Sequence, residues 1–136
     1  MNAATAGGIL GGAVTATANV SDQGGGVCEF SLQQGAVLHQ LRVSVGIMSD
    51  IPKQFPTYLA QCPSNSTPLG GIGNEAVICS VEAQPDQDAE QVVGRVRDQA
   101  FVVSVSSSVQ NDPSMTPKMR REKANLVAEQ IAGILF

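Results

Sequence analysis

The chain has 136 residues, a formal net charge of -4 and a hydrophobic content of 43%. This length fits a single domain, residues 1–136, which has enough apolar residues to fold without a metal or a disulfide framework. The acidic balance argues against nucleic acid as a partner, because binding to phosphates requires a basic surface that releases counterions.

Residues 3–20 are apolar or small and contain glycine pairs spaced as in membrane helix dimers. The segment lacks a dense run of large apolar side chains and has no positive charge before it, so we predict neither a transmembrane span nor a signal peptide. A short helix is expected at its start. Asn2 is its predicted N-cap, Gly11 its left-handed end, and the residues facing inward are Ala6, Ile9 and Leu10.

Three strands are predicted next, over residues 13–20, 27–32 and 37–48. The third is the clearest, because Leu41, Val43 and Val45 alternate with polar residues as in a half-buried antiparallel strand. A short helix is expected within residues 50–62, where two prolines limit it to a turn or two, and a proline-rich loop follows it.

The second half contains a glycine turn, three more predicted strands and a terminal helix. The turn at residues 70–74 lacks the Lys-Ser/Thr of a phosphate loop and precedes a strand, so it is not a nucleotide site. The strands are predicted over residues 75–83, 91–97 and 101–108. Thr116 as N-cap and Pro117 at the first position predict a helix to Phe136. Its apolar stripe, which must lie on the sheet, consists of Ala124, Val127, Ala128, Ile131 and Leu135.

The order of these elements is helix, three strands, short helix, three strands and long helix. It predicts an α+β fold, with a twisted antiparallel sheet of about six strands in two similar halves. The short helices and the long C-terminal helix are expected to pack on one face of that sheet.

The three cysteines are candidates for a disulfide. Cys62 and Cys79 bracket the proline-rich loop, and closing it would contribute roughly 3 kcal/mol through loop-closure entropy. A pair between Cys28 and Cys79 and three free, buried thiols are the alternatives. Zinc is disfavoured because no C-x-x-C pair is present, and we expect neither a metal nor another cofactor.

His39 is the single histidine, so a small thiol-dependent enzyme or hydrolase would have to be built around it and a cysteine. No nucleophile signature lies near it in the sequence, and a surface or interfacial histidine is the favoured interpretation. No catalytic residue is therefore assigned.

Two groups of charged residues have both a functional and an ordinary interpretation. Asp86, Asp88 and Glu90 alternate like calcium ligands, but the later positions of such a loop hold the wrong residues, which favours a solvated hairpin loop. Three arginines, predicted to point outward from their strands, would form a small basic patch on the open sheet face if those strands are neighbours. This candidate ligand or partner face consists of Arg42, Arg95 and Arg97.

Several short motifs together carry a resemblance to a known family. They are the segment AATAGGILGG at residues 3–12, CEF at 28–30, LRVSV at 41–45 and GIGNEA at 71–76, followed by a valine-rich hairpin and an alanine-rich helix. In this succession the chain resembles the small secreted bacterial envelope lipoproteins of an uncharacterised domain family. The resemblance implies an α+β fold and an extracytoplasmic, cell-envelope location, and it implies no catalytic activity.

The leading hypothesis is a non-enzymatic, extracytoplasmic bacterial domain that binds a protein or a small apolar ligand. Its site would be the open sheet face or the groove under the terminal helix. The alternatives are the enzyme built around His39 and a structural or assembly subunit, such as a homodimer, whose sheet edge pairs with itself.

Overall fold

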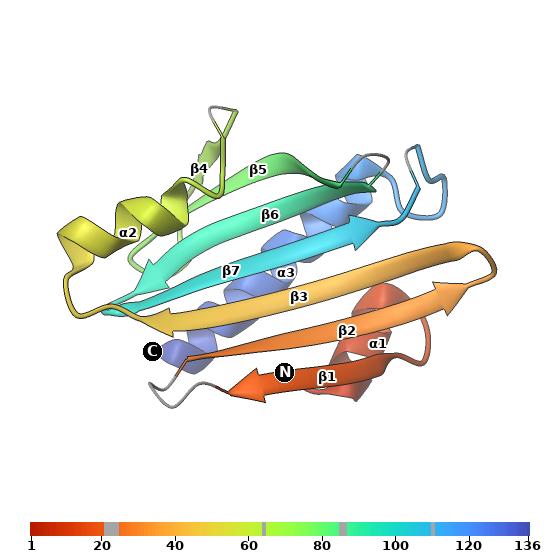
Figure 1. Cartoon of the computed structure of the whole chain (residues 1–136), viewed down its shortest axis with the longest axis horizontal. Coiled ribbons are helices and arrows are strands. Elements are labelled where there is room, and N and C mark those ends of the chain that lie inside the picture. Colours follow the sequence, from red (N-terminus) through yellow and green to blue (C-terminus); the bar gives the residue numbers. More distant parts are fainter. Residues whose placement is uncertain (21–24, 64, 85–86, 110) are drawn as a thin grey trace.

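The computed structural model describes residues 1–20, 25–63, 65–84, 87–109 and 111–136. Within these residues, one antiparallel sheet of seven strands carries three helices, which confirms the predicted α+β class and the long C-terminal helix (Figure 1). In chain order the elements are α1 (Ala3–Leu10), β1 (Thr15–Val20), β2 (Gly26–Gln34), β3 (Val37–Ile47), α2 (Ile51–Leu59), β4 (Thr67–Leu69), β5 (Glu75–Gln84), β6 (Gln87–Val96), β7 (Gln99–Ser107) and α3 (Pro117–Leu135).

The sheet is built from two meanders of three strands. Its strand order is β1-β2-β3-β7-β6-β5-β4, so the last strand of each meander lies at the centre, where Leu41 of β3 is opposite Val105 of β7. The extra strand, β4, arises in the proline-rich loop and pairs with β5 at the edge. Pro68 is tolerated there because an edge strand can leave one side of its backbone unpaired.

Helices α3 and α1 cover one face of the sheet and lie behind it in Figure 1. Val127 and Ala128 of α3 are fully buried against β6 and β7, next to Phe101 and Val103. These side chains fill the space under α3. The hypothesised binding groove under the terminal helix is therefore occupied by the apolar core. None of the helices in the described part of the chain is long and apolar enough to cross a membrane.

Both helix starts have the predicted caps. The Asn2 side chain accepts a hydrogen bond from the backbone N–H of Thr5, and α1 ends at Gly11 with a φ of 97°. Thr116 caps α3 by accepting from the N–H of Met119. Local sequence chemistry therefore determines where these two helices begin.

Helix α2 lies on the opposite face of the sheet, in front of it in Figure 1. Phe55 of α2 packs there with Val93, Ala100 and Val102, so the expectation that all helices share one face is wrong for α2. The physical reason is that β6 and β7 carry apolar residues on both faces, as strands do when they are covered on both sides. Since α1 and α2 precede matching meanders but cover opposite faces, the two halves are similar in strand order and different in helix placement.

Candidate functional site

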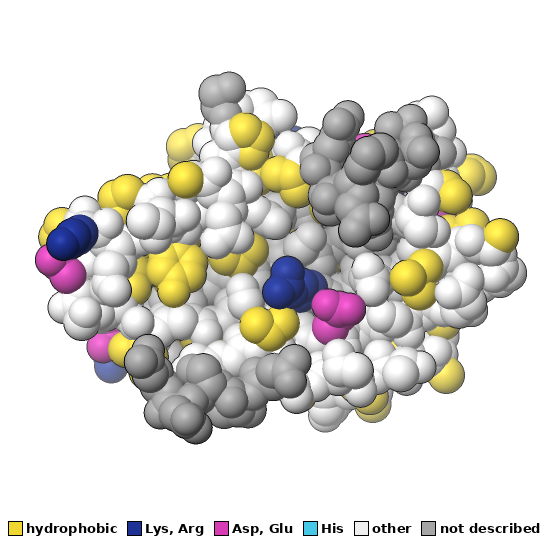
Figure 2. Space-filling model, viewed as in Figure 1, with side chains coloured by type: hydrophobic (Ala, Val, Ile, Leu, Met, Phe, Trp, Pro, Cys, Tyr) yellow, Lys and Arg dark blue, Asp and Glu magenta, His cyan; other side chains and the backbone are white. Residues whose placement is uncertain are grey.

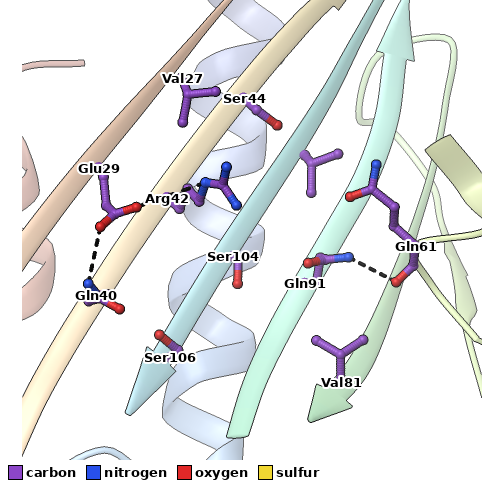
Figure 3. A pocket seen from close by; sticks show the side chains of 11 residues that line it. Val27, Glu29, Gln40, Arg42, Ser44, Gln61, Val81, Gln91, Ser104 and Ser106 are labelled. Atoms are coloured by element: carbon purple, nitrogen blue, oxygen red, sulfur yellow. Dashed lines mark hydrogen bonds and ion pairs between the residues drawn. The ribbon is translucent and has the colours of Figure 1, made fainter. Parts of the chain in front are cut away.

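A depression of about 590 Å³ lies on the sheet face opposite α3, and we call it the sheet trough. Its floor crosses β2, β3, β7, β6 and β5, and a residue just after α2 stands at its rim. Figure 2 shows this face of the molecule, with a basic and an acidic side chain beside each other near its middle and apolar side chains around them. The uncharged polar lining of the trough consists of Gln40, Ser44, Gln61, Gln91, Ser104 and Ser106 (Figure 3). This volume is in the range of small-molecule and peptide sites.

One row of paired residues crosses the trough from strand to strand. Glu29 lies opposite Arg42, Arg42 opposite Ser104, and Ser104 opposite Gln91. The row exists because strand side chains alternate between faces, so the neighbours of Arg42 in the sequence, Leu41 and Val43, point into the core under α3. Alternation along β3 and β7 therefore produces a polar floor above an apolar core.

Arg42 and Glu29 form a loose ion pair on the β2–β3 side of this floor. The Nε of Arg42 is 3.9 Å from Oε2 of Glu29, and the two side chains are 60% and 40% exposed. Gln40 donates a hydrogen bond of 3.2 Å to the other carboxylate oxygen of Glu29 (Figure 3). An exposed pair at this distance contributes little to stability, which leaves the Arg42 guanidinium available to a ligand.

A disulfide fixes the rim of the trough beside α2. Of the pairings that the sequence leaves open, the structure has Cys62 bonded to Cys79, and Cys28 is free and half-buried. Next to the bond, the Gln91 side chain on the floor donates a hydrogen bond of 3.0 Å to the backbone oxygen of Gln61. The disulfide thus anchors the segment that follows α2 to the polar floor.

The three arginines predicted as a patch lie in three different settings. Strand β7 separates Arg42 from Arg95, and Arg95 lies beside α2, where it pairs with Glu75 at 3.1 Å and stacks over the ring of Phe55. Arg97 follows the end of β6 in a turn with a φ of 55°, and its N–H donates to the Asn74 side chain. The structure therefore forms no shared basic patch, and only Arg42 belongs to the trough.

His39 belongs to a polar cluster on the α3 side of the sheet, in which His39, Ser107 and Asp112 are buried and Ser114 is exposed. His39 is 2% exposed, so the favoured interpretation of a surface histidine is wrong. Its Nε2 lies 2.7 Å from Oδ2 of Asp112, and Ser107 donates to the same oxygen at 2.8 Å. Ser114 donates from its backbone N–H and its hydroxyl to Oδ1 at 2.9 and 2.6 Å. These bonds tie the segment after β7 to β3.

The pKa of the Asp112 carboxyl is held well below its usual range. Burial on its own would raise this pKa, but the hydrogen bonds from Ser114, His39 and Ser107 stabilise the charged form and outweigh the burial. Asp112 is thus a buried carboxylate whose charge is stabilised by His39, 73 residues away, and by the nearby Ser107 and Ser114.

This cluster does not have the geometry of a hydrolase triad. In a triad the carboxylate and the nucleophilic hydroxyl contact different ring nitrogens, whereas Asp112 and Ser114 both approach Nε2 of His39, at 2.7 and 3.4 Å. The other nitrogen, Nδ1, is buried without a hydrogen-bond partner among the described residues. The arrangement is suited to holding a loop and not to reaching a substrate.

A thiol enzyme around His39 is also disfavoured by position. Cys28 lies on β2 opposite Val43, whereas Leu32 lies opposite His39, so four residues along the strand separate the thiol from the imidazole. That is about 13 Å at the rise of a β-strand, far beyond hydrogen-bond reach. The other two cysteines are consumed by the disulfide.

The acidic residues predicted as a solvated loop are divided between a strand and a segment outside the described residues. Asp86 lies in that segment, and β6 already begins at Gln87. Glu90 is buried on β6, where it accepts a hydrogen bond of 2.7 Å from Ser80 and has Arg121 at 3.8 Å. No group of three metal-binding side chains is present in the described ranges.

Sequence reasoning missed Asp112 and Arg120. Asp112 had a usable signal, because Asp followed two residues later by Ser in a proline-containing turn favours local side-chain to backbone hydrogen bonds. Arg120 had no such signal, since it lies on α3 among other basic residues. It is nevertheless 2% exposed and donates a hydrogen bond of 2.7 Å to the backbone oxygen of Met115. Beside it a second cavity of about 360 Å³ opens near the start of α3.

The two polar features of the described residues with the most extensive side-chain networks are the sheet trough and the cluster around His39 and Asp112. No protein-family model, curated protein or solved structure matches the chain. The case for a function rests on the geometry of these two features.

Proposed function

We propose that the protein is a non-enzymatic recognition domain that binds a protein partner through the sheet trough. The observation that carries this proposal is the polar row of Glu29, Arg42, Ser104 and Gln91, which stands in an open hollow of about 590 Å³. The other face of the same strands is closed by α3. A sheet that is covered on one side and hollow and polar on the other suits a surface that forms hydrogen bonds with a partner.

The lining favours a protein over a small apolar ligand. Among the described lining residues only Val27, Val81 and Val102 are apolar. An apolar molecule would remove the amides, hydroxyls and charges of the trough from water without replacing their hydrogen bonds, which costs free energy for each group. Peptide groups and polar side chains of a partner supply the missing donors and acceptors.

The residues of the sheet trough and of the cluster around His39 support a non-enzymatic role. The described lining of the trough contains neither histidine nor cysteine, and the His39 side chain is 2% exposed. Chemistry at a substrate needs a reactive group within reach of it, and the open site has binding groups instead.

The disulfide supports a location outside the cytoplasm, in the bacterial cell envelope. Structural disulfides persist in oxidising compartments such as the periplasm and the cell surface and are rare in reducing ones. The bond between Cys62 and Cys79 agrees in this respect with the resemblance to secreted envelope lipoproteins.

Photo-crosslinking in cells tests the proposal with a matched pair of glutamines. A benzophenone amino acid replaces Gln61, exposed at the rim of the trough, or Gln130, exposed on α3 away from the trough. We expect a discrete crosslinked protein from position 61 and none from position 130. Arg42→Glu, which changes an exposed side chain on the floor, should weaken the crosslink from position 61 at least tenfold.

Equal crosslinking from the two positions would contradict a partner at the trough. So would a crosslink from position 61 that Arg42→Glu leaves unchanged, because the proposal gives Arg42 a direct role in binding. Circular dichroism of Arg42→Glu serves as the control for folding.

A further inference from the structure

Within the described residues, strand β1 forms one outer edge of the sheet and leaves one side of its backbone unpaired. It pairs with β2 on its inner side, and no described segment lies beyond it in Figure 1. Thr15, Ala16, Thr17 and Ala18 are all exposed. The strand, TATANV, contains no charged residue and no proline.

As far as the structure describes the chain, the opposite edge of the sheet is protected and β1 is not. Strand β4 has three residues, one of them Pro68, whereas β1 has six residues. Natural sheets protect their edges by shortness, proline, lysine or a covering segment, because an open row of N–H and C=O groups invites another strand. The described part of β1 has none of these devices.

We propose that β1 pairs antiparallel with β1 of a second copy of this chain, with Thr17 on the two-fold axis. This proposal is independent of the partner at the trough. In this arrangement Thr15 lies opposite Asn19 of the other copy and Ala16 opposite Ala18, and the two sheets become one of fourteen strands, twice the seven of one chain. A two-fold contact of this kind uses the same patch on both copies and closes without forming a filament.

The composition of β1 favours a second copy as the occupant. A two-fold axis places identical groups near each other, so any charge close to the axis would meet its own like charge, and the chain as a whole carries a net charge of -4. Strand β1 is free of charge, and threonines directly opposite each other on a sheet form a favourable pair. The edge is thus self-complementary in both hydrogen bonding and charge.

The faces of the two copies also match in this register. Thr17 lies opposite Glu29 within its own sheet, and therefore continues the polar row that crosses the trough. Pairing Thr17 with Thr17 keeps the troughs of both copies on one face of the joined sheet. A contact of six residues per copy is smaller than the roughly 20–30 residues per side of a stable complex, so the dimer depends on concentration.

Disulfide trapping tests the pairing and its register together. Thr17→Cys and Thr15→Cys are made separately in a Cys28→Ser background and are oxidised at high protein concentration. Cα atoms of directly opposed residues are about 4.5–5.5 Å apart, within the range of a disulfide, whereas two copies of residue 15 would be more than about 13 Å apart. We expect at least tenfold more covalent dimer from position 17 than from position 15.

Sedimentation equilibrium of the unmodified chain gives the second readout. We expect an average mass that rises with concentration toward the dimer, a loss of that rise in Thr17→Lys, and no change in Thr67→Lys, the matched change on β4. A monomer at every concentration, equal trapping at positions 15 and 17, or association that survives Thr17→Lys would overturn the proposal.

Discussion

Asp112 shows how one buried charge can order a long segment. Its carboxylate accepts from His39, 73 residues away in the sequence, and from Ser107 and Ser114 on either side of the turn after β7. A buried charge is tolerated only when it is fully hydrogen-bonded, so each donor is needed. The turn is thereby fixed on the end of the sheet from which α3 departs.

Replacing Asp112 by Asn should lower the free energy of unfolding at pH 7 by about 3 kcal/mol, since charged hydrogen bonds are lost inside the protein. The folded-state pKa of Asp112 is lowered, so its contribution is present above the unfolded-state pKa of about 4 and is lost as the pH falls below that value. The difference in stability between wild type and Asp112→Asn should therefore shrink between pH 5 and pH 3, as measured by urea unfolding.

The exposed Asp98 provides the control for this titration. Asp98→Asn should change the stability by less than about 0.5 kcal/mol, as surface substitutions usually do. A gap between wild type and Asp112→Asn that stays constant down to pH 3 would contradict the role given to the Asp112 charge.

Gly94 and Gly133 show that the space around a glycine decides what an added methyl group does. A Cβ on Gly94 would lie 2.6 Å from the ring of Phe101 and 2.9 Å from the backbone oxygen of Glu75, while none of the described atoms lies within 4 Å of one on Gly133. Gly94→Ala should destabilise the protein by about 1–3 kcal/mol through overpacking. Gly133→Ala should stabilise it by up to about 1 kcal/mol, because alanine favours a helix.

Thermal unfolding of the two alanine variants measures both effects side by side. An unfolding temperature of Gly94→Ala equal to that of wild type would mean that the Phe101 ring does not pack over this glycine. A lower unfolding temperature for Gly133→Ala would mean that residue 133 has closer neighbours than the structure shows.

At the scale of elements, α2 is held by its disulfide as well as by its packing. Phe55 anchors the helix to β6 and β7, and the Cys62–Cys79 bond ties the segment after it to β5. Helix α2 covers only part of its sheet face and buries little apolar surface there. The disulfide therefore adds to the stability that this packing provides.

Removing both cysteines, as Cys62→Ala with Cys79→Ala, should lower the free energy of unfolding by about 3 kcal/mol, as loop closure over a sequence separation of 17 implies. Denaturant unfolding with and without a reductant checks this, since wild type should become as unstable as the double variant when reduced. Cys28→Ala should keep its response to the reductant. A wild-type protein whose stability is unaffected by full reduction would remove the disulfide from this account.

The sequence predicts best those elements whose signals are local. Thr116 with Pro117, Asn2 with Gly11, and the alternation along β3 all act through neighbouring residues, and the structure has them as expected. The sheet face on which α2 packs depends instead on which strands are apolar on both faces. That property depends on the order of the strands in the sheet. The burial of His39 likewise depends on its hydrogen bond with Asp112, which is far from it in the sequence. No local sequence pattern predicts that contact.

The trough was only partly accessible to sequence reasoning. Alternation along β3 was enough to point Arg42 outward, but the insertion of β7 between β3 and β6 separates it from Arg95. The turn conformation of Arg97 removes the third member of the predicted patch. Strand order, which single-sequence patterns do not specify, decides which side chains share a site.

For the whole molecule, stability should fall from the centre of the sheet to its edges. Strands β3, β7 and β6 have neighbours on both sides, and β7 is buried along most of its length, whereas β1 and β4 have one neighbour each. Elements with few buried contacts open at lower free energy than the core.

Amide hydrogen exchange in dilute protein should therefore show the slowest exchange in β7 and β3 and the fastest strand exchange in β4 and β1. Dilution keeps any association of β1 from contributing to its protection. Exchange in β4 as slow as in β7 would contradict this gradient.

Both ends of the chain lie on the side of the sheet that carries α1 and α3. Met1 and Leu135 pack against the core on that side, and Phe136 is exposed beside it (Figure 1). A tag, a solid support or a membrane tether joined at either terminus therefore attaches behind the sheet. Immobilised through an end, the molecule presents its hollow face outward, so tethering and recognition do not compete for the same surface.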